Sequence, residues 1–122
     1  KPENILECIA RGIDMFDCVI PTRNARNGMI FTWNGTINLN NAQWKTHHKP
    51  LDPSFPSALS RDYYMSYIRH LFNSKEILGL QLATLHNLTF YQQLVEKARD
   101  KIVEGTFNSW YPQIVKDVKK RI

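Results

Sequence analysis

The feature that most constrains the fold is a largely apolar segment, GIDMFDCVI at residues 12–20, followed directly by a proline. Only Asp14 and Asp17 are polar between residues 13 and 20, and such a run is typical of a buried β-strand. Pro21 lacks the backbone N–H that a central strand needs, so the strand is predicted to end there. Asp17 would then lie near the exit of the strand, where a carboxylate is well placed for chemistry.

The residues after this strand, PTRNARNG, are predicted to form a loop because turn-forming residues end the run. Arg23 and Arg26 lie in this loop, and their guanidinium forks suit a phosphate or a guanine edge. The chain has 16 basic and 11 acidic residues, and its net charge of +5 mildly favours a polyanionic partner. The densest basic cluster is more typical of a solvated helix end than of an RNA contact; it comprises Lys116, Lys119, Lys120 and Arg121.

The first half of the chain also predicts a helix and a hairpin. Pro2 suits the first turn of a helix that ends near Gly12. Asn34-Gly35 lies between short apolar alternations, which predicts a β-hairpin with strands at residues 29–32 and 36–39. A short helix carrying Trp44 is expected next. Three prolines between residues 49 and 56 then predict an extended connector.

After the connector, apolar residues at helical spacing predict a mainly helical region. The expected elements are a helix over Tyr63–Phe72 capped by Ser57 or Ser60, a second capped by Ser74, a third from Thr89 to Glu104 that stops at Gly105, and a last one from Ser109. The composition, 43% hydrophobic and 22% charged, fits a globular domain. No run approaches the roughly 18 apolar residues of a membrane span, and Cys8 and Cys18 are expected to be reduced, so a cytoplasmic location is expected.

Four motifs resemble the C-terminal third of bacterial-type tRNA-guanine transglycosylase, a family also called queuine tRNA-ribosyltransferase. They are DMFDCVIPTRNARNG at 14–28, PLDP at 50–53, EILG at 76–79 and LHNLTFYQQL at 85–94. The resemblance implies an α/β fold: a C-terminal fragment of a (β/α)8 barrel with a β-hairpin and an appended helical subdomain, mostly helical after residue 57. Residues 1–50 would hold the last barrel strand, the RNA-binding loop and the hairpin, and residues 51–122 the helical subdomain. Such a barrel needs about 250 residues, so an excised fragment that is inactive alone is expected.

The family exchanges guanine at the wobble position of tRNA for a deazaguanine base. The resemblance implies that Asp17, the aspartate before the cysteine of DMFDC, is the nucleophile that forms a covalent ribosyl-aspartate intermediate. It also implies that the five-residue stretch Thr22, Arg23, Asn24, Ala25 and Arg26 binds the tRNA anticodon loop, and that the complete enzyme is a homodimer. The general acid carboxylate would lie upstream of this chain.

One family feature is missing from the sequence. The family pattern places Cys-x-Cys-x2-Cys after PLDP and a histidine further on, four ligands that suit zinc. Here Phe55, Ser57 and Ser60 occupy the cysteine positions and only His86 is retained, so neither a zinc ion nor another cofactor is expected.

Other interpretations remain open on the residues alone. Asp17 could be a capping or ion-paired residue, and the two loop arginines could pair with Asp14, Asp52 or Asp62. A non-catalytic RNA-binding or dimerisation module is the alternative function. A relative that acts on archaeosine or DNA substrates is a third possibility.

Overall fold

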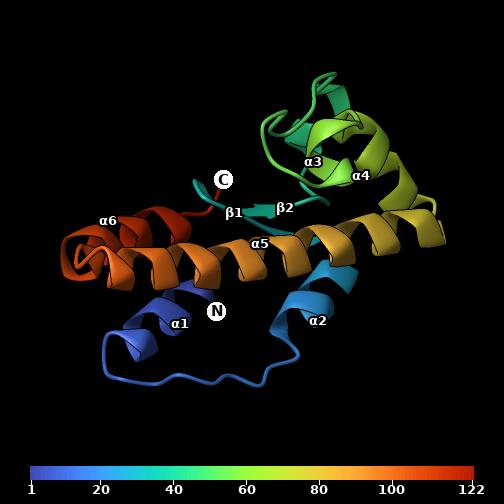
Figure 1. Ribbon diagram of the computed structural model, residues 1–122. Helices are drawn as coiled ribbons and strands as arrows, with labels where there is room; N and C mark the ends of the chain where they lie inside the picture. Colours follow the sequence, from blue (N-terminus) through green and yellow to red (C-terminus); the bar gives the residue numbers. More distant parts are fainter.

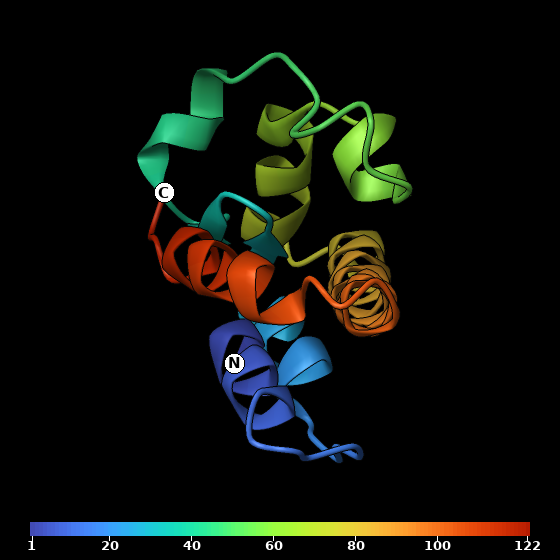
Figure 2. The ribbon, with the colours of Figure 1, turned by 60° about the vertical axis from the view of Figure 1, so that its left-hand side comes forward.

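A computed structural model describes residues 1–122, and a single long helix, α5 (Ile77–Val103), organises the molecule (Figure 1). The other helices, together with a two-stranded antiparallel sheet, surround α5, which contacts α1, α2, α3, α4, α6 and β1. Figure 2, in which α5 is seen almost end-on, shows α1 and α2 on one side of it and α3 and α4 on the other. The elements are α1 (Pro2–Ile9), α2 (Ile20–Arg26), β1 (Met29–Thr32), β2 (Gly35–Asn38), the 3-10 helix η1 (Ala42–Thr46), α3 (Ala58–Arg61), α4 (Met65–Asn73) and α6 (Phe107–Val118). The fold is mostly helical, as predicted after residue 57, but these residues form no barrel.

The predicted strand over residues 13–20 is wrong. Residues 13–18 have no regular secondary structure, and Met15 is 87% exposed. A strand needs a hydrogen-bonded neighbour, and the one sheet in the structure pairs only β1 with β2. The predicted loop is also wrong, because Pro21 lies in the first turn of α2. Proline is tolerated there, since the first N–H groups of a helix have no partner within the helix.

The hairpin prediction is confirmed, with the second strand one residue earlier than predicted, at Gly35–Asn38. β1 and β2 are joined by a two-residue turn, and the fully buried Ile30 and Ile37 are paired across the two strands. The outer edge of β2 is paired with the C-terminal tail: the Thr36 N–H donates to Lys120 O at 2.8 Å, and the Ile122 N–H donates to Thr36 O at 3.0 Å. This pairing covers an edge that would otherwise be open to another chain.

Several helix boundaries differ from those predicted. The helices expected on either side of Thr89 form one continuous α5, in which the Thr89 hydroxyl donates to Leu85 O at 2.8 Å and so stays within the helix. Ser74 does not cap it, because Lys75 adopts a positive φ of 56° and the helix begins only after Glu76. Gly105, with φ of 71°, follows its end as predicted.

The helix that Ser57 or Ser60 is predicted to cap corresponds to α4, whose N-cap residue is Tyr64 and which has no side-chain cap, so this prediction is wrong. Ser57 instead caps a short separate helix, its Oγ accepting from the Ser60 N–H at 3.3 Å. That helix, α3, ends at Arg61, so α4 is a separate element rather than a continuation of it. The last helix, α6, begins at Phe107, two residues earlier than predicted.

Two clusters of buried apolar residues form the core. One lies between α1, α5 and α6 and includes Leu6, Phe90 and Leu94; the other joins α2, the hairpin, α3 and α4 to α5 and includes Ile30 and Leu59. Each cluster draws residues from both sides of residue 50. Both cysteines are free. None of the helices combines the length and the apolarity that crossing a membrane requires.

Candidate functional site

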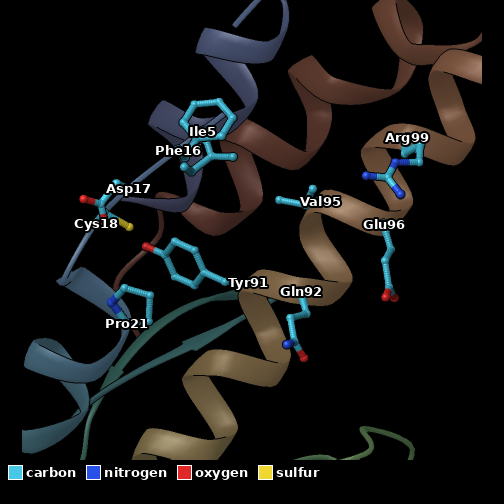
Figure 3. A pocket seen from close by; sticks show the side chains of 10 residues that line it. All are labelled: Ile5, Phe16, Asp17, Cys18, Pro21, Tyr91, Gln92, Val95, Glu96 and Arg99. Atoms are coloured by element: carbon cyan, nitrogen blue, oxygen red, sulfur yellow. The ribbon is translucent and has the colours of Figure 1, made fainter. Parts of the chain in front are cut away.

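A cavity of about 610 Å³ lies between the segment before α2, helix α1 and helix α5 (Figure 3). Asp17 and Cys18 lie on one wall, and Tyr91 comes from α5. The full lining is Ile5, Phe16, Asp17, Cys18, Pro21, Tyr91, Gln92, Val95, Glu96 and Arg99. The cavity therefore contains the residue that the sequence singled out as a nucleophile.

Asp17 is exposed and forms no ion pair or side-chain hydrogen bond. Two residues separate it from α2, which begins at Ile20, and that helix is anchored through the buried Pro21. A carboxylate with no partner keeps its lone pairs available for a reacting group.

Tyr91 lies opposite Asp17 in this cavity and is buried, with only 9% of its surface exposed. Its hydroxyl has no hydrogen-bond partner and points toward the Asp17–Cys18 segment (Figure 3). Burial raises the pKa of this hydroxyl, so it remains a neutral donor in ordinary conditions. A buried donor without an acceptor suits a ligand oxygen at this position.

The five predicted RNA-binding residues lie on α2 rather than on a loop. Arg23 and Arg26 are exposed in its last turn and form no ion pair, so both guanidinium groups are free for phosphate. Thr22 is half-buried, and its hydroxyl donates to Val19 O at 3.2 Å. Asn24 is half-buried near Lys119 and Arg121, whereas Ala25 is fully buried in the core.

The residues at the four positions of the family's zinc site do lie together, but they do not fit a zinc ion. The Ser57 hydroxyl donates to His86 Nδ1 at 2.7 Å, and His86 Nε2 donates to Phe31 O at 2.8 Å, so both ring nitrogens are engaged. The Phe55 ring packs against the imidazole, with 4.8 Å between the centroids. A neutral hydroxyl and a phenyl ring cannot replace thiolate ligands.

Burial lowers the pKa of His86 to about 4, although its hydrogen bond to Phe31 and the charge of Asp52 act in the opposite direction. The histidine is therefore neutral near pH 7, with the proton on Nε2 fixed by the carbonyl of Phe31.

Sequence reasoning missed the residues that α5 contributes to the cavity. In the sequence, Tyr91 is one of several aromatic residues at helical spacing, a pattern typical of a core face. The available signal was the series Gln92, Glu96 and Arg99, whose spacing of three to four residues places polar groups along one side of the helix beside Tyr91.

Comparison with known proteins assigns this chain to a family. Residues 1–120 match the family described as Queuine tRNA-ribosyltransferase. The chain is 48% identical over 110 residues to the queuine tRNA-ribosyltransferase of Caulobacter vibrioides, 49% identical over 110 residues to that of Zymomonas mobilis, and 44% identical over 118 residues to that of Francisella tularensis. These matches cover 90%, 90% and 97% of this chain, but 30%, 28% and 32% of the relatives. The chain belongs to the queuine tRNA-ribosyltransferase family and spans about a third of the length of these relatives.

Proposed function

We propose that this chain is the C-terminal part of a tRNA-guanine transglycosylase, which exchanges guanine at the wobble position for a deazaguanine base in queuosine synthesis. The observation that carries the proposal is the position of Asp17, an unpaired carboxylate in the 610 Å³ cavity at the start of a helix with two free arginines. The relatives are named as tRNA-ribosyltransferases, which agrees with a polyanionic substrate. Such an enzyme acts where tRNA is, in the cytoplasm.

The proposed chemistry consists of two displacements at the ribose C1′. A carboxylate oxygen of Asp17 bonds to C1′ while the bond from C1′ to guanine breaks and guanine leaves with the electron pair. The incoming deazaguanine then attacks C1′ through its ring nitrogen, whose proton passes to the conjugate base of the acid that protonated guanine, and the ester to Asp17 breaks and restores the carboxylate. The acid that protonates the leaving guanine comes from outside these 122 residues, so the isolated chain is inactive in this proposal.

The nucleophile is tested in the complete gene product that carries this chain. Asp17→Asn keeps the shape of the side chain but removes the anionic oxygen, so the denaturant-resistant RNA adduct and base exchange should both be lost. Asp14→Asn is the matched control, because Asp14 lies three residues away in the same exposed segment. Adduct formation and normal exchange by Asp17→Asn would refute the assignment.

The proposed RNA contact rests on the free guanidinium groups of Arg23 and Arg26. Alanine at either position should weaken tRNA binding and flatten its salt dependence, because a phosphate contact releases bound counterions. Arg61→Ala is the control, since Arg61 is already paired with Asp62 at 2.6 Å. Unchanged tRNA affinity in both arginine variants would contradict this role.

In the complete protein, we propose that residues 13–18 pair as the last strand of a (β/α)8 barrel and that two copies associate. The support for association is an apolar groove of about 490 Å³ along the first half of α5, lined by Leu78, Leu82 and Leu85 and bordered by Arg26. Symmetric pairing commonly covers such a surface. Leu85→Glu should shift the dimer to monomers in sedimentation, whereas a mass unchanged by Leu85→Glu would exclude this groove.

We also propose that the helical region folds without zinc. At the position of the family's metal site, both ring nitrogens of His86 are already hydrogen-bonded, one to the Ser57 hydroxyl and one to the Phe31 carbonyl. Elemental analysis should find substoichiometric zinc, and a chelator should leave thermal unfolding unchanged. Stoichiometric zinc, or unfolding by a chelator, would contradict this proposal.

A further inference from the structure

The residue that links the cavity to the rest of the fold is Asn87, which is fully buried on α5. Its Oδ1 accepts from the Phe31 N–H at 3.0 Å, and its Nδ2 donates to Pro21 O at 3.0 Å and to Met29 O at 2.9 Å. A single side chain therefore bonds to the first turn of α2 and to two residues of β1. No other side chain is hydrogen-bonded to both elements.

These bonds use the full donor capacity of the amide. An amide has two N–H donors, and here both are directed to carbonyl oxygens, while its oxygen serves a backbone N–H. Pro21 and Met29 lie 66 and 58 residues from Asn87 in sequence. Hydrogen bonds between such distant segments fix their relative position in the fold.

The link lies close to the proposed nucleophile. Pro21 lies four residues after Asp17, and both line the same cavity. The segment before α2 has no regular structure, so the position of Asp17 depends on where α2 begins. Asn87 holds the first turn of α2 in a fixed position relative to β1 and to α5, the helix that carries Tyr91.

We infer that Asn87 is a positioning residue that holds the start of α2, and with it Asp17, at a fixed place opposite Tyr91. It touches no substrate; it acts through the Pro21 carbonyl. The effect of Asn87 on reaction rate rests on the proposed function. Its effect on the position of α2 does not depend on that function.

The sharpest variant is Asn87→Asp, which keeps an acceptor for the Phe31 N–H and replaces the two-proton donor with an anion facing two carbonyls. His86→Gln is the matched control, because the neighbouring His86 bonds to Phe31 O but not to α2. Both variants disturb β1, and only Asn87→Asp releases α2. Asn87→Ser is the alternative if Asn87→Asp does not fold; the α2 exchange rates and the adduct rate are compared in the same way, without the acid test.

The first readout is hydrogen exchange in the 122-residue chain. In Asn87→Asp the amides of α2 should exchange faster while the Phe31 amide stays protected; in His86→Gln the α2 amides should keep their wild-type rates. Equal acceleration in the two variants, or none in Asn87→Asp, would overturn the inference.

The second readout is the rate of RNA adduct formation in the complete gene product at saturating tRNA, compared at equal folded fractions. Misplacement of a reacting group by about 1 Å costs on the order of 10²-fold in rate, so Asn87→Asp should lose rate on that scale while His86→Gln stays near wild type.

Acidification that protonates the introduced carboxyl restores one donor, so the Asn87→Asp rate should recover relative to wild type. A loss of rate that is equal in both variants, or that acid does not relieve, would indicate only a structural role. Adduct formation by Asp17→Asn would instead refute the proposed function and leave the exchange result standing.

Discussion

The hairpin at residues 29–38 and the segment at residues 13–18 have similar apolar sequences, but only the hairpin is paired and buried. In the hairpin, Ile30 and Ile37 are fully buried, whereas in the earlier segment Ile13 is 47% and Met15 is 87% exposed. The difference lies in their hydrogen-bond partners. β1 is bonded to β2 on one side and to the side chains of His86 and Asn87 on the other. The earlier segment has neither a second strand nor a helix side chain along its backbone.

The comparison shows that α5 takes the place of a third strand. The N–H and C=O groups of Phe31 point to Asn87 Oδ1 and His86 Nε2, so two adjacent side chains satisfy the outer edge of β1. Buried backbone groups must find such partners, and the side chains of a helix can supply them as well as a strand can. Four predictions test this contrast, from the largest expected effect to the smallest.

The largest effect is expected for Asn87→Ala, which leaves the Phe31 N–H and the Met29 carbonyl without partners and removes the hydrogen bond to Pro21 O. Each unsatisfied buried group costs about 1–3 kcal/mol, so the free energy of unfolding should fall by roughly 4 kcal/mol. Urea unfolding of the 122-residue chain measures it. A loss below about 1 kcal/mol would show that α5 does not act as a partner of β1.

Lowering the pH should destabilise the fold at the outer edge of β1, because His86, which bonds to that edge, becomes protonated. Its folded pKa of about 4 lies below the ordinary 6.5, so between these values the unfolded chain binds a proton that the folded chain does not. The free energy of unfolding should therefore fall as the pH drops from about 6.5 to about 4, by on the order of 3 kcal/mol, and be unaffected by this group above that range. Urea unfolding across this range measures it. His86→Gln should lose this component of the pH dependence, and identical profiles for the two proteins would contradict the prediction.

A smaller effect is expected for Ser57→Ala. The Ser57 hydroxyl caps α3 and donates to His86 Nδ1, so its removal costs one cap and one buried hydrogen bond. The expected loss is about 1–2 kcal/mol in thermal or urea unfolding. Ser54→Ala, on the exposed side of the connector, is the control and should change stability little.

The smallest effect is expected for Met15→Ser in the unpaired segment. Because Met15 is 87% exposed, its replacement should change the free energy of unfolding of this chain by less than about 0.5 kcal/mol. In the complete gene product, where the segment is proposed to pair as a strand, the same substitution should destabilise the protein more. An equal effect in both proteins would contradict strand formation there.

The candidate site was only partly predictable from the sequence. Asp17 and the two arginines could be named because their motif is contiguous in the chain. Tyr91 and Asn87 could not be assigned their roles, because what matters for each is a neighbour that lies far away in sequence. Tyr91 resembles any core aromatic until its hydroxyl is found without a partner in the Asp17 cavity.

The sequence by itself determined the local elements whose signals are short-range: the hairpin turn before Gly35 and the helix end at Gly105. It also determined the family and the absence of zinc-ligand cysteines. Only the tertiary structure decided that residues 13–18 remain unpaired, that α5 continues through Thr89, and that His86 and Asn87 bond to β1. The physical reason is that a turn or a cap satisfies its own backbone groups within a few residues. A strand edge or a buried amide is satisfied only by a partner that the fold brings to it.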